Sequence, residues 1–214
     1  CTSRSLAEMS KLPKEYIDVM DAFVCIAGAQ IYEQGTCIVS HPLFYDEIQD
    51  VIRLMDAHDV TYRWVSVDQE NCLNHHDDEI RKRFHALYDM IPETKAYEGQ
   101  KLLHLLYYTH DETLRDQIKK LCQKNYHISL HYASEIMAPH VNKGHGIIEC
   151  AKHWGIAQNE IAAFGDGHND IEMIEAAEIG IAMGNAQDPL KAAADYITDD
   201  VDHDGLYNAC IHFG

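Results

Sequence analysis

The stretch Phe164-Gly165-Asp166-Gly167-His168-Asn169-Asp170 constrains this chain more than any other part of its sequence. It follows a short apolar run, residues 161–164, that is typical of a buried strand, and it precedes residues 171–177, whose apolar spacing predicts a helix. Two carboxylates and an amide therefore lie on a glycine-containing turn between a strand and a helix. In an open parallel sheet, ligands bind outside the carboxyl ends of the strands, and glycines allow the main chain to approach a small ion or phosphate closely. The stretch predicts a binding or catalytic site.

Helix capping is a simpler interpretation of the same residues. Asn169 or Asp170 could act as the N-cap of the helix that follows, which is a common role for Asx side chains. One cap requires one Asx residue, whereas three polar acceptors fall within five positions here. The functional interpretation therefore ranks ahead of capping.

The charge balance limits the partners of this chain. Among its 214 residues, 17 are Lys or Arg and 35 are Asp or Glu, which gives a formal net charge of −18. So acidic a chain argues against a nucleic-acid backbone or an anionic membrane as the main partner. Binding a phosphorylated small molecule would need local help from a metal ion or a placed lysine. The oligomeric state is left open.

Cysteine usage predicts a cytoplasmic protein. The seven cysteines are scattered without a C-x-x-C pair, and several lie inside apolar runs, as reduced and buried cysteines do. This pattern fits a reducing cytosol. No apolar run approaches the length of a membrane span.

The order of the predicted elements indicates an α/β fold. From residue 137 onward, strands, polar turns and helices follow one another as a doubly wound parallel sheet requires. The predicted strands in this part are 161–164, 179–183 and 196–198, and the predicted helices are 142–154, 171–177 and 188–194. Residues 1–40 add a short helix in which Ser5 and Glu8 have capping-box spacing, a strand near 23–26 buried on both faces, and a hairpin over 31–39.

Residues 41–136 have a different character. The predicted helices are 46–58, 80–90 and 111–124, and the predicted strands are 61–67, 101–109 and 126–133. Alternation of apolar and polar residues in these strands is typical of a sheet that is covered on one face. We expect residues 1–40 and 137–214 to form one core and residues 41–136 to form a compact α+β insertion.

Lys143 is the second informative residue. It begins a predicted helix just after Asn142, where the helix dipole disfavours a cation. A helix N-terminus combined with a lysine makes a phosphate site, because backbone N–H donors and a full positive charge converge there. The alternative is a surface lysine whose flexible stem carries the ammonium group away from the dipole.

These segments resemble the haloacid-dehalogenase (HAD) superfamily of phosphohydrolases, and more closely its Cof-type branch. Residues 165–170 are similar to the fourth motif of that superfamily, Val141-Asn142-Lys143-Gly144 to the third, and Thr2-Ser3-Arg4 to the second, which is usually Thr-Gly-Arg. The C-terminal signature of the branch is matched by residues 182–186, 192–198 and 202–205. The resemblance implies a Rossmann-like, doubly wound parallel core, with residues 41–136 as an inserted α+β cap domain that closes over the substrate and sets specificity.

The resemblance also implies a reaction. It is that of a Mg²⁺-dependent phosphatase, which hydrolyses small phosphorylated metabolites such as sugar phosphates through an aspartyl-phosphate intermediate. The implied roles are metal binding for Asp166 and Asp170, contacts to the phosphoryl oxygens for Thr2, Ser3, Lys143 and Asn169, and catalysis for Thr2, Lys143 and Asp170. Asp170 would lie near the metal, through water or by orienting Lys143. These residue types suit phosphoryl transfer, because Mg²⁺ prefers hard oxygen ligands and the reaction depends on positioning and charge neutralisation.

The chain departs from the family pattern in three places. The first motif, Asp-x-Asp-Gly-Thr, supplies the nucleophile and the general acid, and it does not occur in this sequence. We therefore expect the chain to be part of a longer protein whose upstream segment carries that motif, so that the printed chain alone would be inactive. Ser3 replaces a glycine, and Ala27 replaces the asparagine of the usual Asn-Gly-Ala turn. Either replacement would lower activity, the first by narrowing backbone freedom and the second by removing a hydrogen-bonding side chain.

Two other classes of function are compatible with parts of this sequence. The first is a non-catalytic protein of the same fold that binds a phosphorylated ligand or a partner without hydrolysis. The second is a nucleotide-binding Rossmann protein, which is disfavoured because no Gly-x-Gly-x-x-Gly run follows a strand. Within the insertion, Trp64, His104 and Tyr132 are candidates for substrate contact, with core packing as the equally weighted alternative.

Overall fold

A computed structural model describes residues 1–88, 91–129 and 133–214 and divides the chain into two compact units. One unit consists of Cys1–Thr2 and Asn142–Gly214, and the other of Ser3–Val141. Each unit is described by itself below. The division into core segments 1–40 and 137–214 and a cap at 41–136 stays a prediction.

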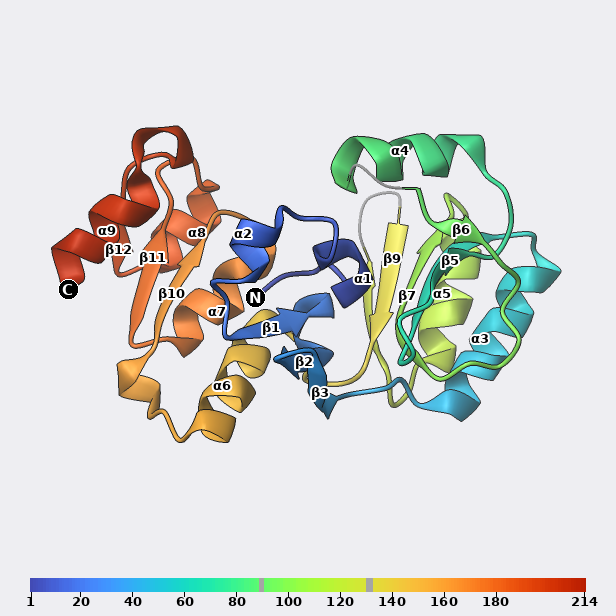
Figure 1. The fold of residues 1–214 in the computed structure, drawn as a ribbon. Coiled ribbons are helices and arrows are strands. Elements are labelled where there is room, and N and C mark those ends of the chain that lie inside the picture. The colour runs from blue at the N-terminus through green and yellow to red at the C-terminus, as the bar shows by residue number, and fades with distance from the viewer. Residues whose placement is uncertain (89–90, 130–132) are drawn as a thin grey trace. The chain divides into compact units, whose positions relative to one another are not determined.

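The unit that contains the C-terminus is a doubly wound α/β structure, as predicted (Figure 1). Its parallel sheet has the order β10-β11-β12, so each strand pairs with the next one along the chain. The strands are β10 (Ala162–Gly165), β11 (Ile179–Ala182) and β12 (Tyr196–Ile197). The helices are α6 (Lys143–Trp154), α7 (Ile171–Ala176), α8 (Asp188–Ala193) and α9 (Gly205–Phe213), with short 3-10 turns η2 (Gln158–Glu160), η3 (His168–Asp170) and η4 (Val201–His203).

The core of this unit forms where small side chains of the strands pack against larger apolar side chains of the helices. Ala163 and Ala182 in the strands pack against Met173 and Ile174 of α7 and Leu190 of α8. The helices begin where the sequence predicts. Asn142 caps α6 by accepting a hydrogen bond from His145 N at 2.7 Å, which satisfies one of the free N–H groups of the first turn.

The other unit begins with two short helices and a small antiparallel sheet. The helices are α1 (Leu6–Met9) and α2 (Lys14–Ile17), and the sheet has the order β1 (Ala22–Cys25), β2 (Gln30–Glu33) and β3 (Thr36–Ser40). The predicted hairpin is confirmed, since β2 and β3 pair around Gln34 and Gly35. The prediction that residues 23–26 are buried on both faces is wrong for Phe23, which is only half-buried, whereas Val24 and Cys25 of the same strand are buried.

The same unit contains a six-stranded sheet of order β6-β5-β4-β7-β9-β8. The strands are β4 (Thr61–Ser66), β5 (Asn71–Leu73), β6 (Glu93–Thr94), β7 (Leu102–Tyr108), β8 (Tyr126–Ser129) and β9 (Ala133–Met137), and the helices are α3 (Tyr45–Ala57), α4 (Asp78–Tyr88) and α5 (Glu112–Leu121). A single strand over 126–133 was predicted, and this is wrong: β8 ends at Ser129, and Ala133 begins β9, which returns antiparallel to β8. The end of the predicted helix 80–90 lies outside the described residues.

The prediction that this sheet is covered on one face is wrong, because helices pack against both of its faces. On one face, Trp64 and Leu105 pack against α3 and α5, and the apolar side predicted for α3 (Ile48, Val51, Ile52 and Met55) is buried there. On the other face, α4 contributes Ile80 and Phe84. Among the described residues, no helix has the length and apolar character needed to cross a membrane.

Candidate active site

The polar turn that follows β10 is organised by Asp170. Its Oδ2 accepts hydrogen bonds from the backbone N–H groups of Asp166 and Gly167, both at 3.1 Å. Asp170 occupies the N-cap position of α7, yet its side chain makes no capping bond to that helix. The carboxylate therefore closes the turn rather than capping α7, which removes the simple capping interpretation for this residue.

Lys143 and Asp170 form a buried ion pair. Lys143 Nζ lies 2.5 Å from Asp170 Oδ1, and the two residues are 8% and 5% exposed. Burial alone would raise the pKa of Asp170, but the hydrogen bond and charge of Lys143 and the two backbone N–H donors outweigh it and hold the pKa below its ordinary value. The carboxylate also compensates the unfavourable position of a cation at the start of α6. Both oxygens of Asp170 are thus engaged, which favours its role in orienting Lys143.

Two close approaches of the backbone make this pair possible. A Cβ atom at Gly144 would lie 2.2 Å from the carbonyl oxygen of Glu172, so α6 and α7 approach as closely as they do because residue 144 has no side chain. A Cβ at Gly165 would lie 2.6 Å from the Cβ of Asp170. The small residues on both sides of the pair therefore bring Lys143 and Asp170 within hydrogen-bonding distance.

Asp166 faces a pocket of about 390 Å³ at the carboxyl end of β10. Its side chain is exposed, unlike that of Asp170. The pocket is lined by Cys1, Lys143, Phe164, Gly165, Asp166, Asp170, Met173, Met183, Asn185, Val201 and Leu206. Two backbone hydrogen bonds connect the turn after β11 to the end of β10 and the turn that follows it. Met183 N donates to Gly165 O and Gln187 N donates to Asp166 O, both at 3.0 Å. An exposed carboxylate in a roomy pocket suits Mg²⁺, which keeps several waters and takes few protein ligands.

The other three residues predicted for the site, Thr2, Ser3 and Asn169, are not among the residues that line this pocket. Asn169 is an exposed residue of η3, and its Oδ1 would lie 2.9 Å from a Cβ at Gly167. Thr2 is half-buried and follows Cys1, whose Sγ is 3.9 Å from Lys143 O. Ser3 belongs to the other unit. The structure thus brings Lys143, Asp166 and Asp170 together in one pocket, and the roles of all six predicted residues stay predictions.

Asn185 was not among the predicted site residues, although it lines the pocket. Its Oδ1 accepts a hydrogen bond from Val201 N at 3.0 Å, which connects the turn after β11 to η4. A signal for it existed in the sequence, since Gly184-Asn185-Ala186 is a small polar turn after a strand, like the turn after β10. Turns after neighbouring parallel strands meet at the same edge of a sheet.

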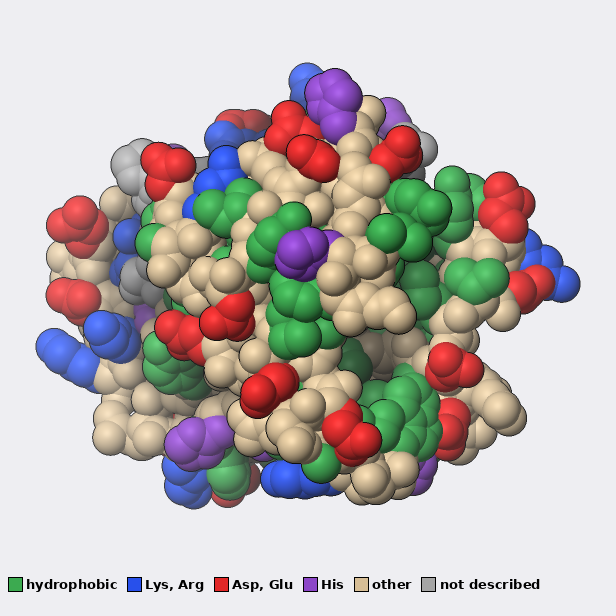
Figure 2. Space-filling model, turned by 90° about the vertical axis from the view of Figure 1, so that its left-hand side faces the viewer, with side chains coloured by type: hydrophobic (Ala, Val, Ile, Leu, Met, Phe, Trp, Pro, Cys, Tyr) green, Lys and Arg blue, Asp and Glu red, His purple; other side chains and the backbone are tan. Residues whose placement is uncertain are grey.

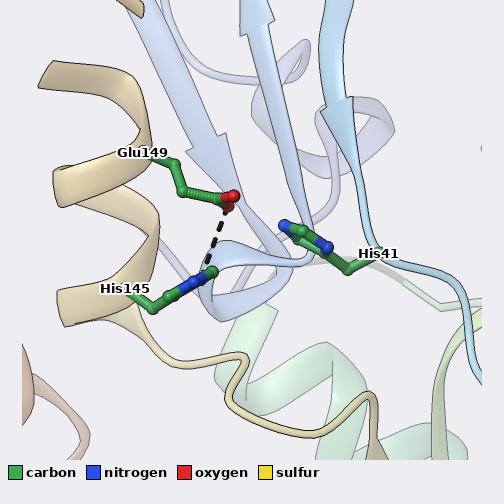
Figure 3. Close-up of side chains that lie close together, drawn as sticks. All are labelled: His41, His145 and Glu149. Carbon is green, nitrogen blue, oxygen red and sulfur yellow. Dashed lines mark ion pairs between the residues drawn. The ribbon is translucent and has the colours of Figure 1, made fainter. Parts of the chain in front are cut away.

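A histidine and a glutamate lie close together further along α6. Figure 3 shows His145 and Glu149 pointing toward each other from successive turns of the helix, and His145 Nδ1 is 3.4 Å from Glu149 Oε2. Both side chains are partly exposed, so this i,i+4 pair would contribute only about 0.3 kcal/mol to the helix when His145 is protonated. We assign it to helix stability.

In so acidic a chain, binding of a phosphate depends on a positive charge placed at the site itself. On the face shown in Figure 2, carboxylates are spread among hydrophobic and neutral side chains, whereas Lys and Arg lie mainly at the margins. A phosphate group in the pocket would meet the ammonium group of Lys143 directly. The exposed Asp166 would repel the same phosphate unless a cation lay between them, so the residues present fit a metal-assisted phosphate site.

Of the insertion residues considered for substrate contact, Trp64 packs in the core. It is fully buried, and its Nε1 donates to Lys95 O at 3.2 Å. His104 is 7% exposed, with its Nε2 3.9 Å from Glu135 Oε2. Tyr132 lies outside the described residues. Of the two alternatives, core packing therefore holds for Trp64, and both stay open for His104.

Comparison with known proteins identifies the family of this chain. The family model of haloacid dehalogenase-like hydrolases matches residues 1–210. The 5-amino-6-(5-phospho-D-ribitylamino)uracil phosphatase YcsE of Bacillus subtilis is 28% identical over 99% of this chain and 77% of its own length. The 5-amino-6-(5-phospho-D-ribitylamino)uracil phosphatase YbjI of Escherichia coli is 26% identical over 82% of this chain and 68% of its own length.

A solved structure shows the same fold. That of the HAD subclass IIB sugar phosphatase BT4131 superposes with a TM-score of 0.85 at 24% identity, covering 100% of this chain and 84% of the other. The parallel sheet with its polar turn, the buried Lys143–Asp170 pair and the family match over residues 1–210 lead to one assignment. The chain belongs to the haloacid dehalogenase-like hydrolases.

Proposed function

We propose that this protein is a Mg²⁺-dependent phosphatase that hydrolyses small phosphorylated metabolites, sugar phosphates in particular, through an aspartyl-phosphate intermediate. The enzyme is a phosphoric monoester hydrolase of the HAD superfamily, in keeping with its family and with the phosphatases among its curated relatives. The substrate class is supported by the relatives, since the ribitylaminouracil phosphates named for YcsE and YbjI carry a phosphorylated sugar-alcohol chain. The cytoplasm is the proposed compartment.

One observation carries the proposal: the exposed carboxylate of Asp166 shares a pocket with the buried, oriented ammonium group of Lys143. In the proposed reaction, a carboxylate oxygen attacks phosphorus, the bond to the alcohol oxygen breaks, and water then hydrolyses the aspartyl phosphate. Lys143 holds a phosphoryl oxygen and neutralises charge that develops on it. Asp170 directs the ammonium group of Lys143, because its Oδ1 accepts a hydrogen bond from Lys143 Nζ.

The remaining roles complete the phosphate site. Asp166, with Asp170 close by, would hold Mg²⁺, which supplies charge neutralisation and orientation of the phosphoryl group when it is bound. Thr2, Ser3 and Asn169 would donate hydrogen bonds to phosphoryl oxygens. The attacking carboxylate would be that of the family's Asp-x-Asp motif, which does not occur within residues 1–214. Residues 41–136 would form the cap that selects the alcohol part of the substrate.

The test is hydrolysis of p-nitrophenyl phosphate by the protein expressed from its complete gene, followed by a panel of sugar phosphates. Turnover should require Mg²⁺ and should stop when EDTA is added. Phosphate binding without turnover in Mg²⁺ would favour the non-catalytic binding protein instead. Turnover that persists in EDTA would contradict the role of the metal.

A further inference from the structure

The pocket beside Asp166 contains few side chains that can donate a hydrogen bond to a phosphate. All of its lining residues belong to the unit that contains the C-terminus. Asp166 and Asp170 carry carboxylates, which only accept hydrogen bonds when they are ionised. Among the described residues that line the pocket, Lys143 and Asn185 are the two with a side-chain N–H group. Lys143 Nζ already donates to Asp170 Oδ1, so Asn185 carries the remaining N–H donor.

The side-chain amide of Asn185 has a defined orientation. Its Oδ1 accepts a hydrogen bond from Val201 N at 3.0 Å. Because a backbone N–H can only donate, the atom of the amide that contacts Val201 must be the oxygen, and Nδ2 is the other one. Within residues 1–88, 91–129 and 133–214, no group accepts a hydrogen bond from Asn185 Nδ2. Both N–H bonds of Nδ2 are therefore available to a ligand in the pocket.

One hydrogen bond and one close approach hold the turn that carries Asn185. Gly184 N donates to Asp199 O at 3.0 Å. A Cβ atom at Gly184 would lie 2.3 Å from Asp200 Oδ1 and 2.6 Å from Asp200 N, so the turn packs directly against this segment because residue 184 has no side chain. A donor on a turn that is held in this way loses little conformational freedom when a ligand binds.

A neutral amide suits a position near Asp166. Gln187 N donates to Asp166 O at 3.0 Å, and Asn185 lies two residues before Gln187 on the same turn. A cationic side chain at position 185 would pair with Asp166 and compete with a metal ion, and a carboxylate would add to the repulsion of a phosphate. An amide donates to a phosphoryl oxygen and does neither.

We propose that Asn185 binds the phosphorylated substrate by donating a hydrogen bond from Nδ2 to a phosphoryl oxygen, and this inference rests on the proposed function. Lys143 at the start of α6 supplies the positive charge, and Asn185 on the turn after β11 supplies a directed neutral donor. The two donors reach the same pocket from different elements of one unit. Asn185 is not one of the six residues to which the family resemblance gives a role.

The competing explanation is that Asn185 only connects its turn to η4 through the bond from Val201 N. The substitution Asn185→Asp separates the two roles, because aspartate keeps an oxygen for Val201 N and replaces the Nδ2 donors by a second oxygen. Asn185→Ala removes the donors and the connection without adding charge. Val201 is 65% exposed, so water can replace the bond to its N–H in the alanine variant.

The experiment measures the melting temperature, and the affinity for inorganic phosphate by calorimetry in saturating Mg²⁺, on the protein expressed from its complete gene. Asn185→Ala should bind phosphate about tenfold more weakly, the usual effect of losing one hydrogen bond to a charged group. KM for p-nitrophenyl phosphate should rise with it, and kcat should change less. Asn185→Asp should lose more affinity than Asn185→Ala. Both variants should melt close to the wild type.

Asn159→Ala is the matched control, since Asn159 is an exposed residue of η2, which precedes β10, whereas the pocket lies at the carboxyl end of that strand. It should change neither the affinity nor the melting temperature. Unchanged phosphate affinity in Asn185→Ala would overturn the binding role. So would a joint loss of affinity and stability in Asn185→Ala that Asn185→Asp restores. Failure of the proposed function would look different, because the wild type would then bind phosphate without Mg²⁺-dependent turnover.

Discussion

Lys143 at the start of α6 donates from Nζ to Oδ1 of Asp170, while Oδ2 of the same carboxylate accepts two backbone N–H groups of the turn after β10. One carboxylate thereby connects a helix N-terminus to the polar turn at the carboxyl end of a strand. The arrangement explains why a lysine is stable where the helix dipole disfavours it. It also directs the charge of Lys143 toward the pocket that contains Asp166.

Replacing Lys143 by methionine should lower kcat/KM for p-nitrophenyl phosphate by about 10²-fold, the usual effect of losing one charged donor to a developing oxyanion. The change also leaves the buried Asp170 without its cation, so the melting temperature should fall. Steady-state kinetics and a thermal scan measure the two effects. Lys152→Met on the exposed side of α6 is the control and should change neither. A Lys143→Met enzyme with wild-type kinetics would exclude Lys143 from the site.

Gly144→Ala should destabilise the protein by roughly 2 kcal/mol, because the new methyl group must displace the backbone of Glu172 and an overpacked contact costs about that much. Activity should fall as well, since the shift separates α6 from α7. Urea unfolding gives the free energy. Lys152→Ala on the same helix should leave it within about 0.5 kcal/mol of the wild type. An unchanged unfolding midpoint for Gly144→Ala would show that the two helices do not approach as described.

Ala27→Gly should stabilise the protein by about 0.5 to 1 kcal/mol. Ala27 has φ 50° and ψ 36°, a left-handed conformation that costs an alanine roughly 1 kcal/mol and a glycine much less. Ala177→Gly is the matched control. Ala177 is also half-buried but has φ −79°, so glycine should destabilise there. Equal effects of the two substitutions on the unfolding free energy would argue against the left-handed turn at residue 27.

Acid should weaken the fold through Glu8. Burial alone would raise its pKa, but the charge of Arg63 and the hydrogen bonds of Ser5 hold the pKa below the ordinary value of 4.5. The folded-state pKa is the lower one, so the stabilisation is fully present above pH 4.5 and is lost as the pH falls through the folded-state value. Urea unfolding of the wild type and of Glu8→Gln at pH 7 and pH 3 should show a smaller difference at pH 3. A difference that grows on acidification would contradict the direction of the shift.

Features that depend on neighbours in the sequence were predictable. The polar turn at 164–170, the helix beginning at Lys143 and the Ser5–Glu8 capping box each depend on a few consecutive residues, and all three are found where they were predicted. The family resemblance rested on the same local segments and is confirmed by the match over residues 1–210.

Features that depend on strand register were not predictable in this way. Residues 126–133 alternate like one strand, and only the pairing of β8 with β9 shows two. Arg63 looks like any polar residue of a half-covered strand. Its ion pair with Glu8 depends on which face of the sheet it occupies and on where α1 lies, and neither is encoded near Arg63 in the sequence. The positive φ at Ala27 was hidden for a related reason, because alanine rarely adopts it.

The most direct test of the central claim is a Mg²⁺ titration of p-nitrophenyl phosphate hydrolysis by the wild type, Asp166→Ala and the surface control Glu175→Ala, each expressed from the complete gene. The account predicts turnover that rises with Mg²⁺ and is abolished by EDTA in the wild type and in the control. It predicts no Mg²⁺-dependent turnover in Asp166→Ala at any concentration. Unchanged Mg²⁺-dependent turnover in Asp166→Ala would contradict the assignment of the metal site to the pocket beside Lys143 and Asp170.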